Sequence, residues 1–493
     1  MLREFKPSVP VETRKKKTAD SIFHELTRSL CPVCRRVIDA QIHLRDGKVI
    51  MRKRCKDHGW FEALISPDAE AYVDSVRFNK PGTIPLEFTT EVKDGCPHDC
   101  GLCPEHKQHA CLGLIEVNTG CNLACSTCFA DAGPGHNLTM EEVEMMLETF
   151  VRTEGDPEVL QYSGGEPTLH PLLPDFVRLA QAKGIRHVMI NTNGLRFARD
   201  PEWAATIGEL KPMIYLQFDG LTDETYVTLR GEPLLAEKLK ALDRLAELDL
   251  DTVLVAAIER GVNEHEIGPL VEFGLKHPAV RGVNFQPVTH TGRHPDFDPL
   301  DRVTIPEVVG RIAEQTSGQF AKSDFVPVPC CNPGCQSVTY AYVEDGKVTP
   351  LPRLLNVDDY LDYITNRTWP EFSADIKVAL EGLWSSSAAP GGDTLADQFE
   401  CVACDLGLIA SGHELAKHVF AISIKDFMDT YTFDVKKVMK CCVEIITPEG
   451  KMVPFCAYNN VGYREADRAF MAKKRLAERQ AKKGLVTIEL DEV

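Results

Sequence analysis

The sequence predicts an α/β protein built around a partial barrel of six βα units, with cysteine-rich metal-binding segments on both sides. Apolar strand-like runs alternate with helical patterns in the middle of the chain, which is typical of a parallel sheet. The 18 cysteines are also unevenly spread, because none lies between residues 129 and 329. The chain therefore divides into a cysteine-rich head, a cysteine-free middle and a cysteine-rich tail.

The expected elements of the middle follow from the spacing of apolar residues. We expect strands at 114–117, 159–162, 188–190, 214–218, 253–258 and 283–285, and helices at 140–153, 172–183, 234–248 and 265–275. In parallel barrels and sheets, ligands bind at the carboxyl ends of the strands. Residues that follow these strands are therefore the first candidates for a functional site.

Composition excludes several classes of protein. With 493 residues the chain should hold two to four domains, and its 43% apolar and 26% charged residues indicate a folded protein. A net charge of −18 argues against a nucleic-acid binder. No apolar run reaches the ~20 residues that span a bilayer, and the N-terminus lacks the apolar core of a signal peptide. We expect a cytoplasmic protein, in which cysteines serve metal binding or catalysis rather than disulfides.

Three cysteines follow the first expected strand at the spacing CxxxCxxC: Cys121, Cys125 and Cys128, with Phe129 next. Three thiolates on one tight loop can hold three irons of a [4Fe–4S] cluster. The fourth iron is then open and can chelate a substrate or cofactor.

The second strand ends in Gly164, Gly165, Glu166 and a proline. The two glycines let the backbone approach a ligand closely, and Glu166 offers an acceptor to an amino group. The next two strands also deliver polar residues to the same rim, namely Asn193, Gln217 and Asp219.

Together these motifs resemble the radical S-adenosylmethionine (SAM) superfamily over roughly residues 112–300. The resemblance implies that a reduced cluster cleaves SAM and that the 5′-deoxyadenosyl radical abstracts hydrogen from a carbon that acid–base chemistry cannot activate. It also implies roles for single residues: cluster ligands Cys121, Cys125 and Cys128; Phe129 beside the adenine; Gly164, Gly165 and Glu166 at the methionine end; Asn193, Gln217 and Asp219 at the ribose or substrate. Arg230 could pair with the SAM carboxylate or be a solvated residue at a helix end.

The head contains two further cysteine groups. Cys96, Cys100 and Cys103 repeat the CxxxCxxC spacing, but no strand leads into them and no GGEP strand follows, so they fit the radical site less well. Upstream, CPxC at 31–34 and Cys55 resemble half of a rubredoxin knuckle or a zinc ribbon. His58 could be a ligand there, although a solvated turn histidine is favoured.

The tail carries the remaining cysteines. Of the 18 cysteines in the chain, we set aside the three of the radical site, Cys111, and one member of each of the two adjacent pairs, which leaves twelve thiolates. Twelve suffice for three four-thiolate sites. We expect two auxiliary [4Fe–4S] clusters and one mononuclear iron or zinc, with the division of ligands left open. The candidate ligands are Cys31, Cys34, Cys55, Cys96, Cys100, Cys103, Cys331, Cys335, Cys401, Cys404, Cys456 and the adjacent pair Cys441 and Cys442, of which the count of twelve uses one.

A narrower resemblance rests on the CPxC…CxxHG head, the GCPxDCGLCPxH segment at 95–106 and the tail motifs at 423–459. Over most of 25–460 these resemble the archaeal tetraether lipid synthase family and its bacterial relatives. This implies a transferase- or lyase-like radical enzyme that modifies or couples lipid chains. The alternatives are radical methylation of a pterin-like small molecule, maturation of a peptide or protein, and a non-catalytic iron–sulfur electron carrier.

We expect five segments: a flexible basic tail (1–24), a cysteine-rich domain (25–111), the radical SAM core (112–300), an auxiliary iron–sulfur domain (301–460), and a basic helix and tail (461–493). Expected partners are a small electron donor of the ferredoxin or flavodoxin type and a lipid or small-molecule substrate. The basic helix could dock on anionic lipid at the inner face of the membrane, although a solvated helix is favoured. We also expect 401–456 to fold over the barrel mouth, with a cluster of Cys441 or Cys442 and Cys456 near the substrate.

Overall fold

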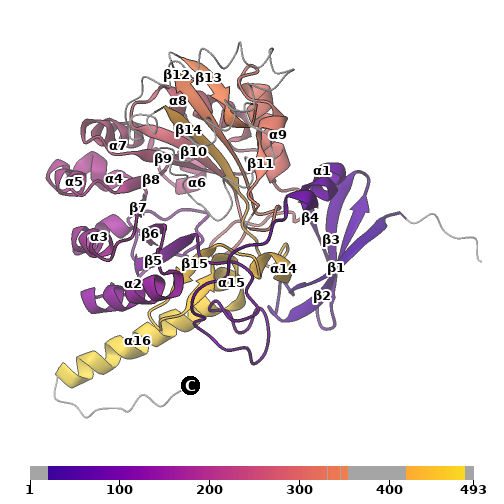
Figure 1. Cartoon of the computed structure of the whole chain (residues 1–493), viewed down its shortest axis with the longest axis horizontal. Coiled ribbons are helices and arrows are strands. Elements are labelled where there is room, and N and C mark those ends of the chain that lie inside the picture. The colour runs from indigo at the N-terminus through magenta and orange to yellow at the C-terminus, as the bar shows by residue number, and fades with distance from the viewer. Residues whose placement is uncertain (1–19, 330, 345, 354–417, 483–493) are drawn as a thin grey trace, which may run out of the picture.

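The computed structural model describes residues 20–329, 331–344, 346–353 and 418–482, and it contains two sheets (Figure 1). The smaller sheet is antiparallel, has the order β1-β2-β3-β4, and lies to one side of the larger sheet in Figure 1. Its strands are β1 (Ile22–Leu30), β2 (Val37–Arg45), β3 (Lys48–Cys55) and β4 (Gly59–Ser66).

The larger sheet has the order β11-β12-β14-β10-β9-β8-β7-β6-β5-β15-β16, with β13 paired to β12. The six strands from β5 to β10 are parallel and adjacent in chain order, so the six strands expected from the sequence are confirmed. They are β5 (Leu112–Asn118), β6 (Val159–Gly164), β7 (His187–Thr192), β8 (Met213–Gln217), β9 (Thr252–Ile258) and β10 (Val280–Pro287).

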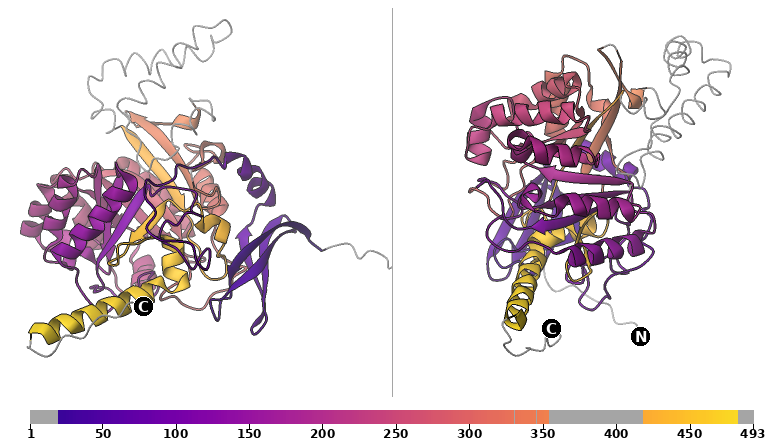
Figure 2. Two further views of the ribbon diagram at one scale, coloured as in Figure 1. Left: turned by 60° about the horizontal axis from the view of Figure 1, so that its bottom comes forward. Right: turned by 90° about the vertical axis from the view of Figure 1, so that its left-hand side faces the viewer.

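Helices connect these strands and cover the outer face of the sheet (Figure 2). The four expected helices are confirmed, with additional short helices between β7 and β9. α2 shows how the sequence sets a boundary: Thr139 and Glu142 form a capping box at its first turn. The helices are α2 (Met140–Glu154), α3 (Leu173–Ala182), α4 (Leu195–Arg199), α5 (Pro201–Gly208), α6 (Asp223–Arg230), α7 (Leu235–Glu247), α8 (Ile267–Lys276) and α9 (Ile305–Gln315).

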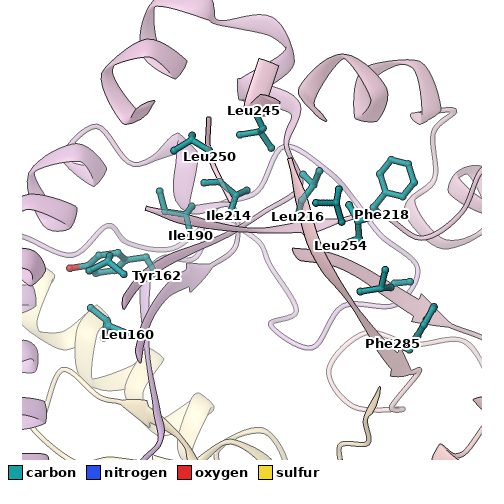
Figure 3. Packing of buried hydrophobic residues seen from close by; sticks show 14 of the residues in the cluster. Leu160, Tyr162, Ile190, Ile214, Leu216, Phe218, Leu245, Leu250, Leu254 and Phe285 are labelled. Atoms are coloured by element: carbon teal, nitrogen blue, oxygen red, sulfur yellow. The ribbon is translucent and has the colours of Figure 1, made fainter. Parts of the chain in front are cut away.

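Alternate residues of each strand face opposite sides of the sheet. The outward side is a continuous apolar core under the helices; Leu160 and Tyr162 of β6 belong to it (Figure 3). Tyr162 also donates its hydroxyl proton to the Phe176 carbonyl at 2.6 Å. The residues between them, Gln161 and Ser163, line a cavity on the inward side. The helices therefore stabilise the sheet, and the inward face is left for a ligand.

Strands from the tail occupy both edges of the parallel part of this sheet. β14 (Val419–Lys425) pairs in parallel with β10, and β15 (Val443–Ile446) pairs in parallel with β5. We expected residues 401–456 to fold over the barrel mouth; in the described part of this segment, β14 and β15 extend the sheet itself, and Phe427 and Phe455 line the cavity. The physical reason is that an open edge leaves unpaired N–H and C=O groups, which added strands satisfy. Cys401 and Cys404 lie outside the described residues.

The remaining described elements are short, apart from the last helix. They are α1 (Ala69–Asp74), η1 (Ser75–Phe78), η2 (Pro167–Leu169), η3 (Glu264–Glu266), η4 (Lys322–Asp324), β11 (Val326–Pro327), β12 (Gln336–Glu344), β13 (Lys347–Pro350), η5 (Leu351–Arg353), α14 (Val435–Val438), β16 (Met452–Pro454), α15 (Phe455–Val461) and α16 (Tyr463–Lys482).

The basic helix α16 packs on the core along part of its length. Met471 is fully buried in the main hydrophobic core, and Phe470 packs against that core. Lys474 and Arg475 form ion pairs with Glu142 of α2. Burial alone would raise the pKa of Glu142, but these two cations hold it at about 2. Phe470 and Met471, two apolar residues of the helix that was considered for lipid contact, therefore contact the protein. Among the described residues, no helix is long and apolar enough to cross a membrane.

This packing predicts different effects for two substitutions in α16. Met471→Ala should lower the free energy of unfolding by about 2–5 kcal/mol, because it leaves a cavity in the core. Leu476→Ala should change it by less than about 0.5 kcal/mol, because Leu476 is 56% exposed. Urea denaturation followed by circular dichroism measures both. Equal losses would contradict the packing of α16 described above.

Candidate active site and metal centres

The inward face of the sheet encloses a cavity of about 300 Å³, lined by residues from every strand between β5 and β10. The loop after β5 carries Cys121, Cys125 and Cys128, and all three line this cavity. Cys125 is buried, while Cys121 and Cys128 are partly exposed. The structure thus brings the three cysteines together at the carboxyl ends of the strands, where the sequence predicted a cluster.

The glycines after β6 are required by the backbone of the cysteine loop. A Cβ atom on Gly164 would lie 2.3 Å from the Asn118 carbonyl oxygen, and one on Gly165 would lie 2.2 Å from that of Gly120. Gly164 also has a φ of +131°, which strongly favours glycine. The sequence predicted close approach to a ligand. The structure shows that the glycines also admit the loop that holds the cysteines.

Glu166 is buried and organises the rim. Its Oε2 atom accepts a hydrogen bond from the Asn193 backbone N–H at 2.8 Å, and its Oε1 atom accepts from the hydroxyls of Thr168 and Thr192. The Asn193 side chain donates to Asn122 Oδ1, inside the cysteine loop, at 2.7 Å. Glu166 and Asn193 both line the cavity, and they also join the β6 and β7 ends to the loop.

Arg230 lies at the cavity with its guanidinium buried, so it is not a solvated residue at a helix end. It donates two hydrogen bonds to Asp219, at 2.7 and 2.6 Å. Asp219 is fully buried and is not part of the cavity wall; it also accepts from the Ala257 N–H. The structure therefore places Asp219 behind Arg230 rather than against a ligand.

Lys238 of α7 completes this charge cluster and was missed in the sequence. Its ammonium donates to the carbonyl oxygens of Asn193 and Gln217, at 2.6 and 2.8 Å. Burial lowers its pKa to about 8, although Asp219 opposes the shift. The sequence indicates this role of Lys238 only by placing a lysine at a buried position of an amphipathic helical pattern. It fixes the ends of β7 and β8, and Gln217 itself lines the cavity.

Phe129 belongs to an aromatic group at the cavity that the sequence did not predict. Its ring makes edge contacts with Phe427 and Phe455 of the tail, with centroids 5.4 and 5.6 Å apart. All three rings line the cavity. Tail residues therefore shield the cysteine loop from solvent on this side.

The part of the cavity wall formed inside the sheet is rich in amides and hydroxyls. These side chains come from alternate positions of the strands. The sequence alone did not identify them, because which strand positions face the cavity depends on how the strands pair. They are Gln161, Ser163, Asn191, Tyr215, Asn284, Gln286 and Ser423. Apolar residues such as Met189 and Val255 lie between them.

Tail cysteines reach the same cavity. Cys442 lines it together with Lys425, and the thiol of Cys331 contacts that of Cys442. Burial lowers the pKa of Lys425, but the electrostatic influence of Cys442, Cys331 and Cys335 outweighs burial and raises it. Cys456, whose sulfur accepts from the Met428 N–H, and Cys441 lie in the same tail region. Cys111, which had no predicted role, also lines the cavity.

Cys96, Cys100 and Cys103 form a separate group. They line a small second cavity with His106 of the head and with Val438 and Met439 of the tail. His106 Nε2 lies 3.0 Å from the Cys441 carbonyl oxygen. This group is therefore outside the main cavity, as expected for an auxiliary site.

The small sheet holds a compact metal-binding group of Cys31, Cys34, Cys55 and His58, whose ligand atoms all lie within 4.8 Å of one another. His58 Nδ1 is 3.5 Å from Cys31 Sγ and 3.4 Å from Cys55 Sγ. We expected His58 to be a solvated turn histidine, but it belongs to this group, although its side chain is exposed. Arg36 donates to Cys34 Sγ and lowers the pKa of that thiol, which favours the metal-binding thiolate. Three sulfurs and one imidazole nitrogen suit tetrahedral zinc.

Known proteins are similar to most of this chain. A family model described as the radical SAM superfamily matches residues 115–274, and one described as the HMPTM N-terminal zinc ribbon domain matches residues 23–67. A 7,8-dihydro-6-hydroxymethylpterin dimethyltransferase of Methanocaldococcus jannaschii is 34% identical over 491 residues, covering 90% of this chain and 95% of that protein.

Other similarities are confined to parts of the chain. A GTP 3′,8-cyclase of Chlorobaculum tepidum is 32% identical over 187 residues, covering 36% of this chain and 56% of that protein. The crystal structure of Streptococcus suis SuiB bound to SAM has a TM-score of 0.36 at 15% identity, covering 42% of this chain and 47% of that chain.

The glycine contacts predict a specific defect. Gly165→Ala should displace the loop of Cys121, because the new methyl group would meet the Gly120 carbonyl. Iron and sulfide content after anaerobic reconstitution should fall by about one cluster per chain. Gly133→Ala is the matched control, since nothing lies within 4 Å of its added Cβ. Full cluster content in the Gly165→Ala variant would show that the loop does not need this close contact.

The small sheet predicts a metal site that is independent of the cavity. His58→Ala should lower the metal content of the purified protein by up to one ion per chain, because one of four ligands is removed. The iron of the other sites should not change. His24→Ala, which changes a histidine of β1 outside this group of four, should retain all metal. Elemental analysis by mass spectrometry measures each, and unchanged metal in the His58→Ala variant would remove His58 from the site.

Proposed function

Because the chain belongs to the radical SAM superfamily, and is related over nearly its whole length to a pterin dimethyltransferase, we propose that it methylates a pterin-like small molecule. Its cofactors are a [4Fe–4S] cluster and SAM, together with a metal in the N-terminal zinc ribbon. When bound, the cluster and SAM supply a 5′-deoxyadenosyl radical. The remaining question is which substrate the protein presents to it.

The single observation that carries the proposal is the polar wall inside the sheet. A pterin is a flat bicyclic ring with hydrogen-bonding groups around its edge and apolar faces. The amides of Gln161, Asn191 and Asn284 meet such an edge, and Val255 and Met189 supply apolar contacts between them. Ligand pockets commonly combine apolar walls with a few convergent polar groups. A hydrocarbon chain in the cavity would leave the buried Asn284 Oδ1 atom without a hydrogen-bond partner, at a cost of about 1–3 kcal/mol.

The charges around the cavity also favour a small uncharged ring. Among the described lining residues, Arg230 is paired with Asp219 and Arg464 with Glu116. Lys425 is the remaining cation, and it donates to Gln336 Oε1 at 3.2 Å. A nucleoside triphosphate would need several cations for its phosphates. This argues against GTP as the substrate, despite the partial similarity to a GTP 3′,8-cyclase.

We assign the chain's own residues the following parts. Cys121, Cys125 and Cys128 hold the cluster, with Gly164 and Gly165 allowing their loop to sit against β6. Glu166 and Asn193 fix the rim on which the methionine end of SAM rests. Arg230, held in place by Asp219, offers its guanidinium to the SAM carboxylate. Phe129, Phe427 and Phe455 keep water away from the reacting carbon, which a radical reaction requires.

The other functions considered have less support. The lipid substrate implied by the tetraether resemblance has no counterpart in the full-length relative, which is a pterin enzyme by its name. A peptide substrate would need an extended groove, and the main cavity is small. An electron carrier would have no use for the polar cavity wall. A small ferredoxin- or flavodoxin-type donor remains our proposal for the reductant.

The test is anaerobic turnover of the reconstituted protein with SAM, dithionite and 7,8-dihydro-6-hydroxymethylpterin. Mass spectrometry should detect 5′-deoxyadenosine and a pterin carrying one or two added methyl groups. SAM with a labelled methyl group tells whether that methyl or another one-carbon donor is used. The Cys121→Ala/Cys125→Ala/Cys128→Ala variant should form neither product. Formation of 5′-deoxyadenosine with no change in the pterin would contradict the proposed substrate.

A further inference from the structure

Asn284 of β10 lines the main cavity and carries an acceptor without a partner. Its side-chain Nδ2 donates to Ser423 Oγ of β14 at 2.5 Å, and the two residues are directly paired in the parallel register of these strands. Its Oδ1 atom is buried and has no hydrogen-bond partner. Asn284 and Ser423 both line the cavity. An unpaired buried carbonyl is costly, and a ligand that donates a hydrogen bond would remove that cost.

Two other amides at the cavity are held in the same way. Asn191 Nδ2 donates to Ser163 Oγ at 3.3 Å, and Gln286 Nε2 donates to the Tyr215 hydroxyl at 3.1 Å. In each case the amide nitrogen is used by a hydroxyl on another strand. The carbonyl oxygen and the second N–H of each amide are then the groups left for a ligand. The wall therefore presents acceptors from β7 and from two positions of β10.

We propose that Asn284, oriented by Ser423, recognises the amino edge of a 2-amino-4-oxopyrimidine ring. This edge carries adjacent exocyclic and ring N–H donors, which match a set of amide acceptors. The inference rests on the proposed function, because a pterin carries this edge, but it adds the group that is read and the residue that reads it. Asn284 determines specificity by binding the 2-amino group, and Ser423 is a positioning residue that keeps the amide oxygen turned inward.

The electrostatic surroundings agree with an acceptor at this position. Among the described residues that line the cavity, the carboxylates are Glu116 and Glu166, and both already have cationic or N–H partners. Lys425 of β14, two residues after Ser423, is a donor that could meet the 4-oxo group of the same ring. Lys425 and Asn284 thus supply complementary partners for the two sides of the pyrimidine.

The test measures binding rather than turnover. Reconstituted full-length protein with SAM, and without reductant, is dialysed anaerobically against 7,8-dihydro-6-hydroxymethylpterin or its analogue that lacks the 2-amino group. The native protein should bind the pterin about 10- to 100-fold more tightly than the analogue, because the analogue leaves a buried acceptor unpaired. SAM binding is measured in every variant to show that it is folded.

Three variants separate the outcomes. Asn284→Leu should lose most of the preference for the amino group, and Asn284→Asp, which keeps an acceptor of the same size, should retain it. Ser423→Ala should weaken the preference by freeing the amide. An undiminished preference in Asn284→Leu, or a lost preference in Asn284→Asp, overturns the role of Asn284. A native protein that binds pterin and analogue equally overturns this inference alone, whereas one that binds neither overturns the proposed function as well.

Discussion

The hydrogen-bonded pairing of tail strands with both edges of the parallel sheet is the constraint on which the rest of the structure depends. β14 completes the wall beside β10, and β15 completes it beside β5. Without them the inward face of the sheet would be open at both sides. Because Cys442 directly precedes β15 and Lys425 ends β14, the same pairing brings a tail cysteine and a cation into the cavity of the cysteine loop.

Buried charges around this cavity are paired with one another, which allows them to remain charged away from water. Arg230 and Asp219 form one bidentate pair, and Arg464 and Glu116 form a second. The first pair is local, with its residues 11 positions apart, whereas the second joins residues 348 positions apart. The second ties α16 to β5, which explains how the last helix helps to hold the strand that leads to the cysteine loop.

Features set by local sequence could be predicted, and features set by strand pairing could not. The βα alternation and the spacing of Cys121, Cys125 and Cys128 are local patterns. The contact of Asn284 with Ser423 joins residues 139 positions apart, so no local pattern indicates it. His58 was considered as a ligand but a turn residue was favoured, because a histidine three residues after Cys55 is consistent with either role. The burial of Met471 was not predicted, since the pattern of α16 does not show which face meets α2.

The central claim is that the cavity presents a carbon of a pterin to the 5′-deoxyadenosyl radical. The most direct measurement uses 7,8-dihydro-6-hydroxymethylpterin deuterated at its ring and side-chain carbons in a single anaerobic turnover. The account predicts that deuterium from the pterin appears in 5′-deoxyadenosine, and that its amount matches the methylated pterin formed. Unlabelled 5′-deoxyadenosine, formed at the same rate with and without the pterin, would show that the cavity does not bring this substrate to the radical.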